Sequence, residues 1–143
     1  MQVKKLISMK LNKFRIKCPS CGKVIDIESN TTCSCGSPLV LPEDGMIEMY
    51  RVGNVFGAAV GFGIYLNDIP MGHLGNTELV RVPVPYGHYK VHMTQGMSRK
   101  CVDQEFDVTP QNRIVYLKAH VNLGIFTNTV VIEQSTADQM PKN

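Results

Sequence analysis

The sequence lacks any apolar run long enough to cross a bilayer. The uncharged stretch from Val55 to Leu66 has 12 residues and contains three glycines, whereas a membrane-spanning helix needs about 20 apolar residues. A secretory signal is not recognisable either, because lysines interrupt the apolar residues of the first 14 positions and no small-residue cleavage site follows. We therefore expect a cytoplasmic protein without a transmembrane helix.

Acidic residues are absent from the first 23 positions, which carry seven lysine and arginine residues. The rest of the chain has 8 basic and 12 acidic residues, so the net charge of +3 divides into +7 and −4. This asymmetry predicts an electrostatic binding element near the N-terminus. Its candidate residues are Lys4, Lys5, Lys10, Lys13, Arg15, Lys17 and Lys23.

Residues 1–13 form this basic arm, in which apolar residues recur near helical spacing between the lysines. Both a short amphipathic helix and a disordered arm are compatible with this pattern. Two binding hypotheses follow from it. The arm could bind nucleic acid phosphates together with the cysteine-rich segment, or it could attach the chain peripherally to an anionic membrane surface.

A catalytic constellation is also missing. No serine lies in a nucleophile elbow and no carboxylate pair stands out. His88 and His92 are expected on one strand face, where structural histidines are much more frequent than a metal site. The sequence therefore predicts a non-enzymatic protein and implies no small-molecule substrate.

Four of the five cysteines form two tight pairs, Cys18 with Cys21 and Cys33 with Cys35. A glycine follows each pair and can adopt the positive φ that turns backbone N–H groups toward the sulfurs. Four thiolates suit one tetrahedral Zn²⁺ ion and leave no open position for a catalytic water. Cys101 lies outside the pairs; Arg99 and Lys100 could favour its thiolate, but a lone cysteine on a strand is usually a small core residue.

The segment from Phe14 to about Leu41 resembles the zinc-ribbon family, because two cysteine knuckles alternate with short strands. The resemblance implies one structural zinc ion on Cys18, Cys21, Cys33 and Cys35, and a hairpin between the pairs with Ser29 and Asn30 at its tip. The second knuckle is Cys-x-Cys where the family usually has Cys-x-x-Cys. Iron in the same cage and a redox-sensitive zinc switch are the open alternatives; a disulfide does not suit the reduced compartment.

The chain after Gly45 shows only strand patterns, separated by turn residues at roughly ten-residue spacing. They predict about seven strands in an antiparallel β-sandwich, with a hairpin turn at Asn67-Asp68. In the strand after Pro85, Tyr89, Val91 and Met93 alternate with His88, Lys90 and His92. The seven segments are IEMYRV, GFGIYLND, ELVRVPV, GHYKVHMTQ, KCVDQEFDV, RIVYLKAHV and IFTNTVVIEQ.

This second half, from Ile64 to about Val121, resembles the PEGA-type bacterial β-sandwich domains of unknown function. The resemblance implies an interaction or scaffold module rather than a catalyst. The motifs that carry it are Leu66-Asn67-Asp68, Met71-Gly72, Pro85-Tyr86-Gly87-His88-Tyr89 and Ile114-Val115-Tyr116-Leu117.

Together these patterns predict an all-β protein with a small zinc ribbon followed by a sandwich. The predicted units are a basic arm (1–13), the ribbon (14–41), a linker (42–45), the sandwich (46–134) and a flexible tail (135–143). The leading functional hypothesis is an interaction or assembly module with a protein partner. Nucleic-acid binding and membrane attachment are the alternatives.

Overall fold

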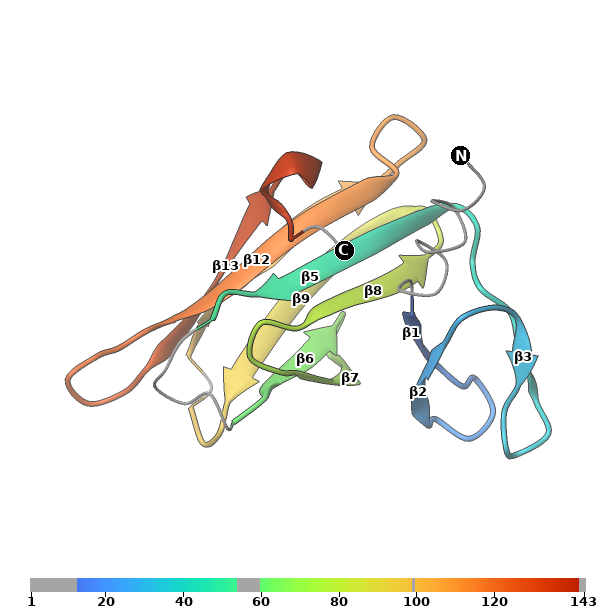
Figure 1. Cartoon of the computed structure of the whole chain (residues 1–143), viewed down its shortest axis with the longest axis horizontal. Coiled ribbons are helices and arrows are strands. Elements are labelled where there is room, and N and C mark those ends of the chain that lie inside the picture. Colours follow the sequence, from blue (N-terminus) through green and yellow to red (C-terminus); the bar gives the residue numbers. More distant parts are fainter. Residues whose placement is uncertain (1–12, 54–59, 99, 142–143) are drawn as a thin grey trace.

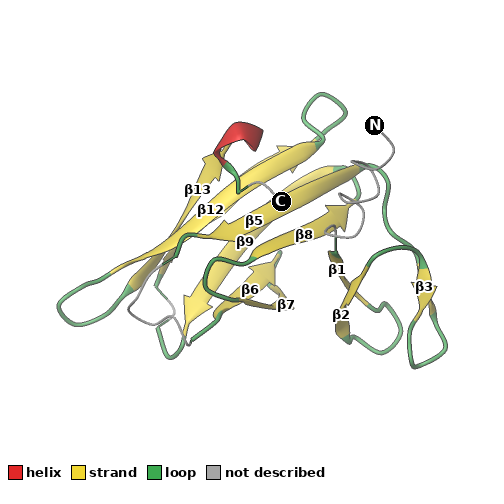
Figure 2. Cartoon of the chain, viewed as in Figure 1, coloured by secondary structure: helices red, strands yellow, loops and turns green. Residues whose placement is uncertain are grey.

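The computed structural model of the chain describes residues 13–53, 60–98 and 100–141. Strands dominate these residues, and their one helix is the short 3-10 turn η1 (Ala137–Gln139), as Figure 2 shows. The all-β prediction is confirmed. No helix in the described ranges combines the length and the apolar character that crossing a membrane requires. The predicted basic arm lies outside the described residues except for Lys13.

The larger sheet has the strand order β10-β13-β12-β5-β8-β1-β2 among the described residues. Long central strands alternate between buried and half-buried residues, as in the burial of Ile47 and Met49 on β5. The strands are β1 (Phe14–Lys17), β2 (Val24–Ile27), β5 (Gly45–Arg51), β8 (Leu79–Val84), β10 (Cys101–Val102), β12 (Ile114–Asn122) and β13 (Thr129–Ser135).

The smaller sheet has the order β11-β9-β6-β7 within the described part of the chain. Its strands are β6 (Phe62–Leu66), β7 (Ile69–Leu74), β9 (Gly87–Gln95) and β11 (Gln104–Val108). Asn67 and Asp68 both have positive φ, of 49° and 66°, which is the backbone of a two-residue type I′ hairpin turn. The hairpin predicted at these two residues is confirmed.

One apolar core fills the space between the two sheets. It includes Phe62 and Met93 from the smaller sheet and Ile47, Leu117 and Ile132 from the larger one. The alternation predicted for the strand after Pro85 is confirmed, because Val91 and Met93 are buried while the histidines on that strand face outward. Two sheets around one shared core form a sandwich.

The strand pairing within the larger sheet is mixed, whereas the sequence patterns predict an antiparallel arrangement. Strand β12 runs parallel to β5, with Tyr116 opposite Glu48, and β10 runs parallel to β13. In each of these two pairs the strands are neighbours in the sheet, although other strands lie between them along the chain. Period-two patterns identify strands but carry no information about which distant strand is the partner.

The described β domain also has more strands than the seven predicted. Strand β7 was missed, because Pro70 and Gly72 make its sequence look like a loop; Gly72 has a φ of 85° next to a register shift opposite β6, as in a β-bulge. The segment KCVDQEFDV is two strands, since the chain leaves the larger sheet after Val102 and enters the smaller one at Gln104.

The cysteine-rich segment adds its first two strands to the edge of the larger sheet. Strand β1 pairs with β2, and Phe14 lies opposite Arg81 of β8 in a single parallel bridge. A second hairpin is made by β3 (Thr31–Thr32) and β4 (Pro38–Leu39). In Figure 1 these two hairpins lie beside the sandwich at the end of the sheet that carries β8.

A second apolar cluster lies inside the cysteine-rich segment, separate from the sandwich core. It contains Ile16, Ile27 and Leu39 together with Cys18 and Cys33. The chain thus has two apolar cores but one continuous larger sheet. Independent folding of residues 14–41 and 46–134, with 42–45 as a linker, stays a prediction.

The chain after β13 packs back onto the fold at one point. Met140, just beyond η1, is buried, with 6% of its surface exposed. The prediction of a flexible tail did not anticipate this contact, because the polar composition of the segment hides a single apolar anchor. Residues 142–143 lie outside the described part of the chain.

Candidate metal centre

The first cysteine pair occupies the turn between β1 and β2. Cys18 follows β1 directly, and its backbone N–H donates to the carbonyl of Lys23 at 2.8 Å, while Gly22 N–H donates to the carbonyl of Cys18 at 2.9 Å. Gly22 has a φ of 76°, a conformation that costs glycine little. This closed turn places Cys18 and Cys21 on the same side of the hairpin.

The second pair lies in an equivalent turn between β3 and β4. Cys33 N–H donates to the carbonyl of Ser37, and Gly36 N–H donates to the carbonyl of Cys33, both at 2.8 Å. Gly36 has a φ of 92°. The positive φ predicted for the glycine after each pair is therefore confirmed for both turns, including the shorter Cys-x-Cys turn.

The predicted hairpin between the two pairs is wrong. Each cysteine pair sits in the turn of its own hairpin, β1–β2 or β3–β4, and Ser29 and Asn30 connect the two hairpins. The Asn30 side chain accepts a hydrogen bond from the backbone of Leu41 at 2.9 Å. This bond fixes the connection, so the sequence between the pairs is a crossover rather than a β-turn.

The two turns bring all four sulfurs together. The Sγ atoms of Cys18 and Cys35 are 3.6 Å apart, as are those of Cys21 and Cys33, and the four sulfurs lie within 4.8 Å of one another. Four sulfurs at about 2.3 Å from a tetrahedral ion would be about 3.8 Å apart. A disulfide requires about 2.05 Å, so these four cysteines are free thiols in a geometry that could hold a metal ion.

Comparison of the chain with known protein families, curated proteins and solved structures gives no match. The resemblances to the zinc ribbon and to the PEGA-type domains therefore rest on the residues of this chain alone. The spacing of the four sulfurs and the chemistry of thiolate donors support a metal centre.

The electrostatic environment of the thiols differs from one cysteine to the next. A hydrogen bond from the Cys21 backbone lowers the pKa of the Cys18 thiol to about 6, and a backbone hydrogen bond from Cys35 lowers that of Cys33. The Ser37 backbone also lowers the pKa of Cys35, but interactions with the Cys18 and Cys33 sulfurs outweigh it and raise this pKa to about 11. Four adjacent thiolates repel one another, and a bound cation would offset that repulsion.

The four-cysteine cluster is continuous with the small apolar core, which includes Cys18 and Cys33. Cys18 and Cys33 are buried, whereas Cys21 and Cys35 are exposed. The side chains of Ser20 and Ser37 join the two turns through a 2.9 Å hydrogen bond. The four-cysteine cluster is therefore half-enclosed.

One of the predicted basic residues, Arg15, is engaged in contacts within the fold. The Arg15 Nε atom lies 3.0 Å from a carboxylate oxygen of Asp26, and its Nη1 atom donates to the carbonyl of His73. Lys4, Lys5 and Lys10 lie outside the described residues, and Lys13, Lys17 and Lys23 remain as candidates. The one described arginine of the predicted element has a structural role.

The histidines of β9 contact different carboxylates rather than each other. His88 lies between Asp107 and Glu105 on β11, at 2.8 and 3.2 Å, and the Asp107 hydrogen bond raises its pKa. His92 lies 2.7 Å from Asp103.

A second group of metal-ligating residue types, not predicted from the sequence, combines His92 and Asp103 with Cys101. Burial raises the pKa of the Cys101 thiol to about 12, and its sulfur accepts a 3.4 Å hydrogen bond from the backbone of Met93. Cys101 also packs against the sandwich core. A protonated, half-buried thiol of this kind is the small core residue that the sequence indicated.

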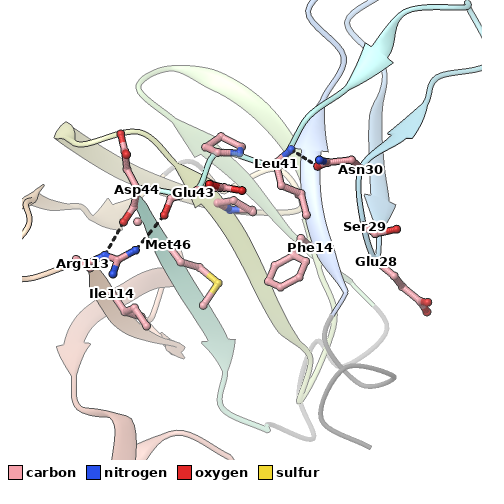
Figure 3. A pocket seen from close by; sticks show the side chains of 13 residues that line it. Phe14, Glu28, Ser29, Asn30, Leu41, Glu43, Asp44, Met46, Arg113 and Ile114 are labelled. Atoms are coloured by element: carbon pink, nitrogen blue, oxygen red, sulfur yellow. Dashed lines mark hydrogen bonds between the residues drawn. The ribbon is translucent and has the colours of Figure 1, made fainter. Parts of the chain in front are cut away.

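A groove of about 660 Å³ lies between the sandwich and the two hairpins of the cysteine-rich segment, residues 14–41, which we call the ribbon for short. Figure 3 shows Phe14 and Leu41 from the ribbon side and Met46 from β5 approaching the same hollow. Arg113 closes one end by donating to the backbone carbonyls of Glu43 and Asp44, at 3.0 and 2.8 Å. This groove was not predictable from the sequence, because its walls come from five segments that are separated along the chain.

The rim of the groove is acidic. Three acidic residues, Glu28, Glu43 and Asp44, line the groove together with one arginine, Arg113. In Figure 3 the Glu28 side chain points away from the hollow, which leaves Glu43 and Asp44 as the acidic residues of the rim. Within the described part of the chain, none of these three carboxylates belongs to an ion pair. An apolar floor with an acidic rim suits an apolar segment that also carries positive charge.

Proposed function

We propose that this protein is a non-enzymatic interaction module in which one structural Zn²⁺ ion, held by Cys18, Cys21, Cys33 and Cys35, shapes a groove for a protein partner. The observation that carries the proposal is the convergence of four sulfurs from two hairpin turns at near-tetrahedral spacing. Zn²⁺ favours this ligand set, and four protein ligands leave no position for a water molecule. The centre would thus stabilise structure rather than catalyse a reaction.

The metal would fix one wall of the groove. Leu39 packs in the small core with Cys18 and Cys33, and Leu41, two residues later, lines the groove. On the opposite wall, Met46 belongs to the sandwich. Loss of the metal would release the ribbon wall, because a segment of this size buries too little apolar surface to fold alone.

The partner that fits this groove is a polypeptide segment with apolar side chains flanked by lysine or arginine. The apolar floor would bury its hydrophobic residues, and the carboxylates of Glu43 and Asp44 would attract its charges. The same carboxylates would repel nucleic acid phosphates. The groove thus supports the protein-partner hypothesis over the nucleic-acid hypothesis.

Site-specific photo-crosslinking in the native cells tests this function. A photoreactive amino acid at Met46 should capture a polypeptide, and mass spectrometry should locate the attachment within a basic, apolar segment. The control position is Ile69, an exposed apolar residue of the smaller sheet outside the groove.

Charge reversal supplies the second arm of this test. Glu43→Lys combined with Asp44→Lys should reduce capture at position 46 about tenfold or more, because it reverses the charge of the rim. Capture at Met46 that matches capture at Ile69, or that yields nucleic acid, would refute the proposed partner class while leaving the metal assignment intact.

A further inference from the structure

An exposed apolar cluster lies on two loops remote from the metal centre. Met97 follows β9, and Leu123, Ile125 and Phe126 lie in the loop between β12 and β13. Met97, Ile125 and Phe126 are 99%, 94% and 95% exposed, and no other large apolar residue of the described chain exceeds 66%. We call these four residues the apolar tip.

The two loops of the apolar tip are bonded together. The Ser98 hydroxyl donates to the backbone carbonyl of Asn128 at 2.6 Å, and the Asn128 side chain donates to that of Gln95 at 3.4 Å. Met97 and Phe126 line the same shallow hollow. The exposed side chains are therefore presented on a defined surface rather than on independent loops.

The hairpin itself depends on a close backbone approach. A Cβ atom at Gly124 would lie 2.1 Å from the carbonyl oxygen of Thr127, so the turn in this conformation requires glycine there. At the base of the hairpin, Val130 N–H donates to the carbonyl of Lys100 at 2.9 Å. These contacts hold Ile125 and Phe126 at the end of the hairpin.

The shape of this region favours a lipid surface over a protein surface. In Figure 1 the loop between β12 and β13 projects beyond both sheets at the left of the molecule. Stable protein interfaces bury about 800 Å² on each partner and need a broad matching surface. A narrow projection with four apolar side chains is too small for that but can enter the interfacial region of a bilayer.

The local charge favours an anionic lipid. No acidic residue occurs between Met93 and Val102 or between Val121 and Ile132 in the sequence, so no carboxylate of these loops would repel the headgroups. Lys100 is exposed beside the base of the hairpin. A lysine near an anionic membrane surface contributes about 1 kcal/mol to binding.

We propose that the apolar tip inserts into the interfacial region of an anionic bilayer, with Ile125 and Phe126 entering first and Lys100 contacting the headgroups. This attachment is independent of the zinc centre and of the groove. It is also distinct from attachment through the basic N-terminal arm, because its side chains belong to the loops after β9 and after β12.

Tryptophan fluorescence tests the insertion directly, because the chain contains no tryptophan. The full chain carrying Phe126→Trp is mixed with vesicles of phosphatidylcholine alone or with 30% phosphatidylserine. With the anionic vesicles, the emission should shift to shorter wavelength and should be quenched by lipids brominated in the acyl chain. The control is Val40→Trp, at an exposed position of the ribbon, whose emission should not change.

Sedimentation with the same vesicles provides the affinity. Ile125→Ser combined with Phe126→Ser should weaken binding about tenfold or more, since two large apolar side chains no longer enter the bilayer. Lys100→Gln should weaken it about fivefold. Val40→Ser should have no effect.

Three outcomes would overturn the insertion. The first is sedimentation of the Phe126→Trp variant without a shift in its emission, which would mean that another element, such as the arm, binds the lipid. The second is a concentration-dependent shift without vesicles, which would indicate contact between two copies of the chain. The third is absence of binding to either vesicle at about 50 mM salt.

Discussion

The guanidinium of Arg15 donates a 2.6 Å hydrogen bond to the backbone carbonyl of His73. Arg15 lies on β1 of the cysteine-rich segment, and His73 lies on β7 at the edge of the smaller sheet. Strand β1 belongs to the larger sheet. The bond therefore links the ribbon to the smaller sheet as well. Only 11% of the Arg15 side chain is exposed, so water competes little for this interaction.

Replacing Arg15 by Met should loosen the attachment of the ribbon. A hydrogen bond from a charged donor contributes about 1.5–3 kcal/mol, and methionine keeps much of the apolar stem. We expect faster amide exchange in β1 while β5 and β12 exchange as before. The control Lys17→Met, on the same strand, should leave the exchange of β1 unchanged. If β1 exchanges in the Arg15→Met variant as it does in the unmodified chain, the bond does not hold the ribbon.

Leu39 tests the link between the small core and the metal. It is 1% exposed and packs with Cys18 and Cys33, so Leu39→Ala should cost about 2–5 kcal/mol of ribbon stability. Because ribbon folding is linked to metal binding, zinc affinity should fall about 30-fold or more. A competition titration with a zinc chelator measures this, and Val40→Ala at the adjacent exposed position is the matched control. Equal affinities for the two variants would contradict the linkage.

The stability of the sandwich should depend on pH through His88. Hydrogen bonds with Asp107 and Glu105 raise its pKa above the ordinary value of 6.5. The stabilisation is therefore complete below about pH 6.5 and is lost as the pH rises through the higher pKa of the folded state. Asp107→Asn should lower the pKa measured by NMR, and a His88 pKa at or below the ordinary value in the unmodified chain would show that the pairing is absent in solution.

Removing the metal should unfold the small core of the ribbon and leave the sandwich core folded. A strong chelator should abolish the order of residues 14–41, while residues 46–134 keep dispersed amide signals and a cooperative melting transition, because the sandwich core contains no cysteine of the cluster. A chain that starts at Glu43 should fold as well. Collapse of the whole spectrum would mean that the shared sheet makes the two cores one cooperative unit.

Local patterns identified much of this molecule from the sequence. The cysteine spacing with Gly22 and Gly36 indicated the two cysteine turns, and the Asn67-Asp68 pair indicated the turn that follows β6, because each depends on the backbone preferences of adjacent residues. The alternation on β9 likewise assigned its buried face. These features need no information from the rest of the chain.

Features that depend on distant residues were not predictable in this way. The parallel pairing of β12 with β5 and the change of sheet after Val102 follow from the packing of the whole domain. Arg15 contacts the carboxylate of Asp26 and the carbonyl of His73. These contacts were not predictable, because neither partner is adjacent to Arg15 in the sequence. The groove and the apolar tip also arise from segments that meet only in the folded chain.

The measurement that tests the central claim most directly is the metal content of the native protein by native mass spectrometry, after purification without added metal. We predict one zinc ion per chain, and its loss in Cys35→Ser, because the sulfur of Cys35 lies 3.6 Å from that of Cys18 and completes the four-thiolate set. Cys101→Ser should keep the full zinc content. Iron in place of zinc would correct the identity of the ion, and full zinc content after the loss of Cys35 would contradict the four-cysteine centre.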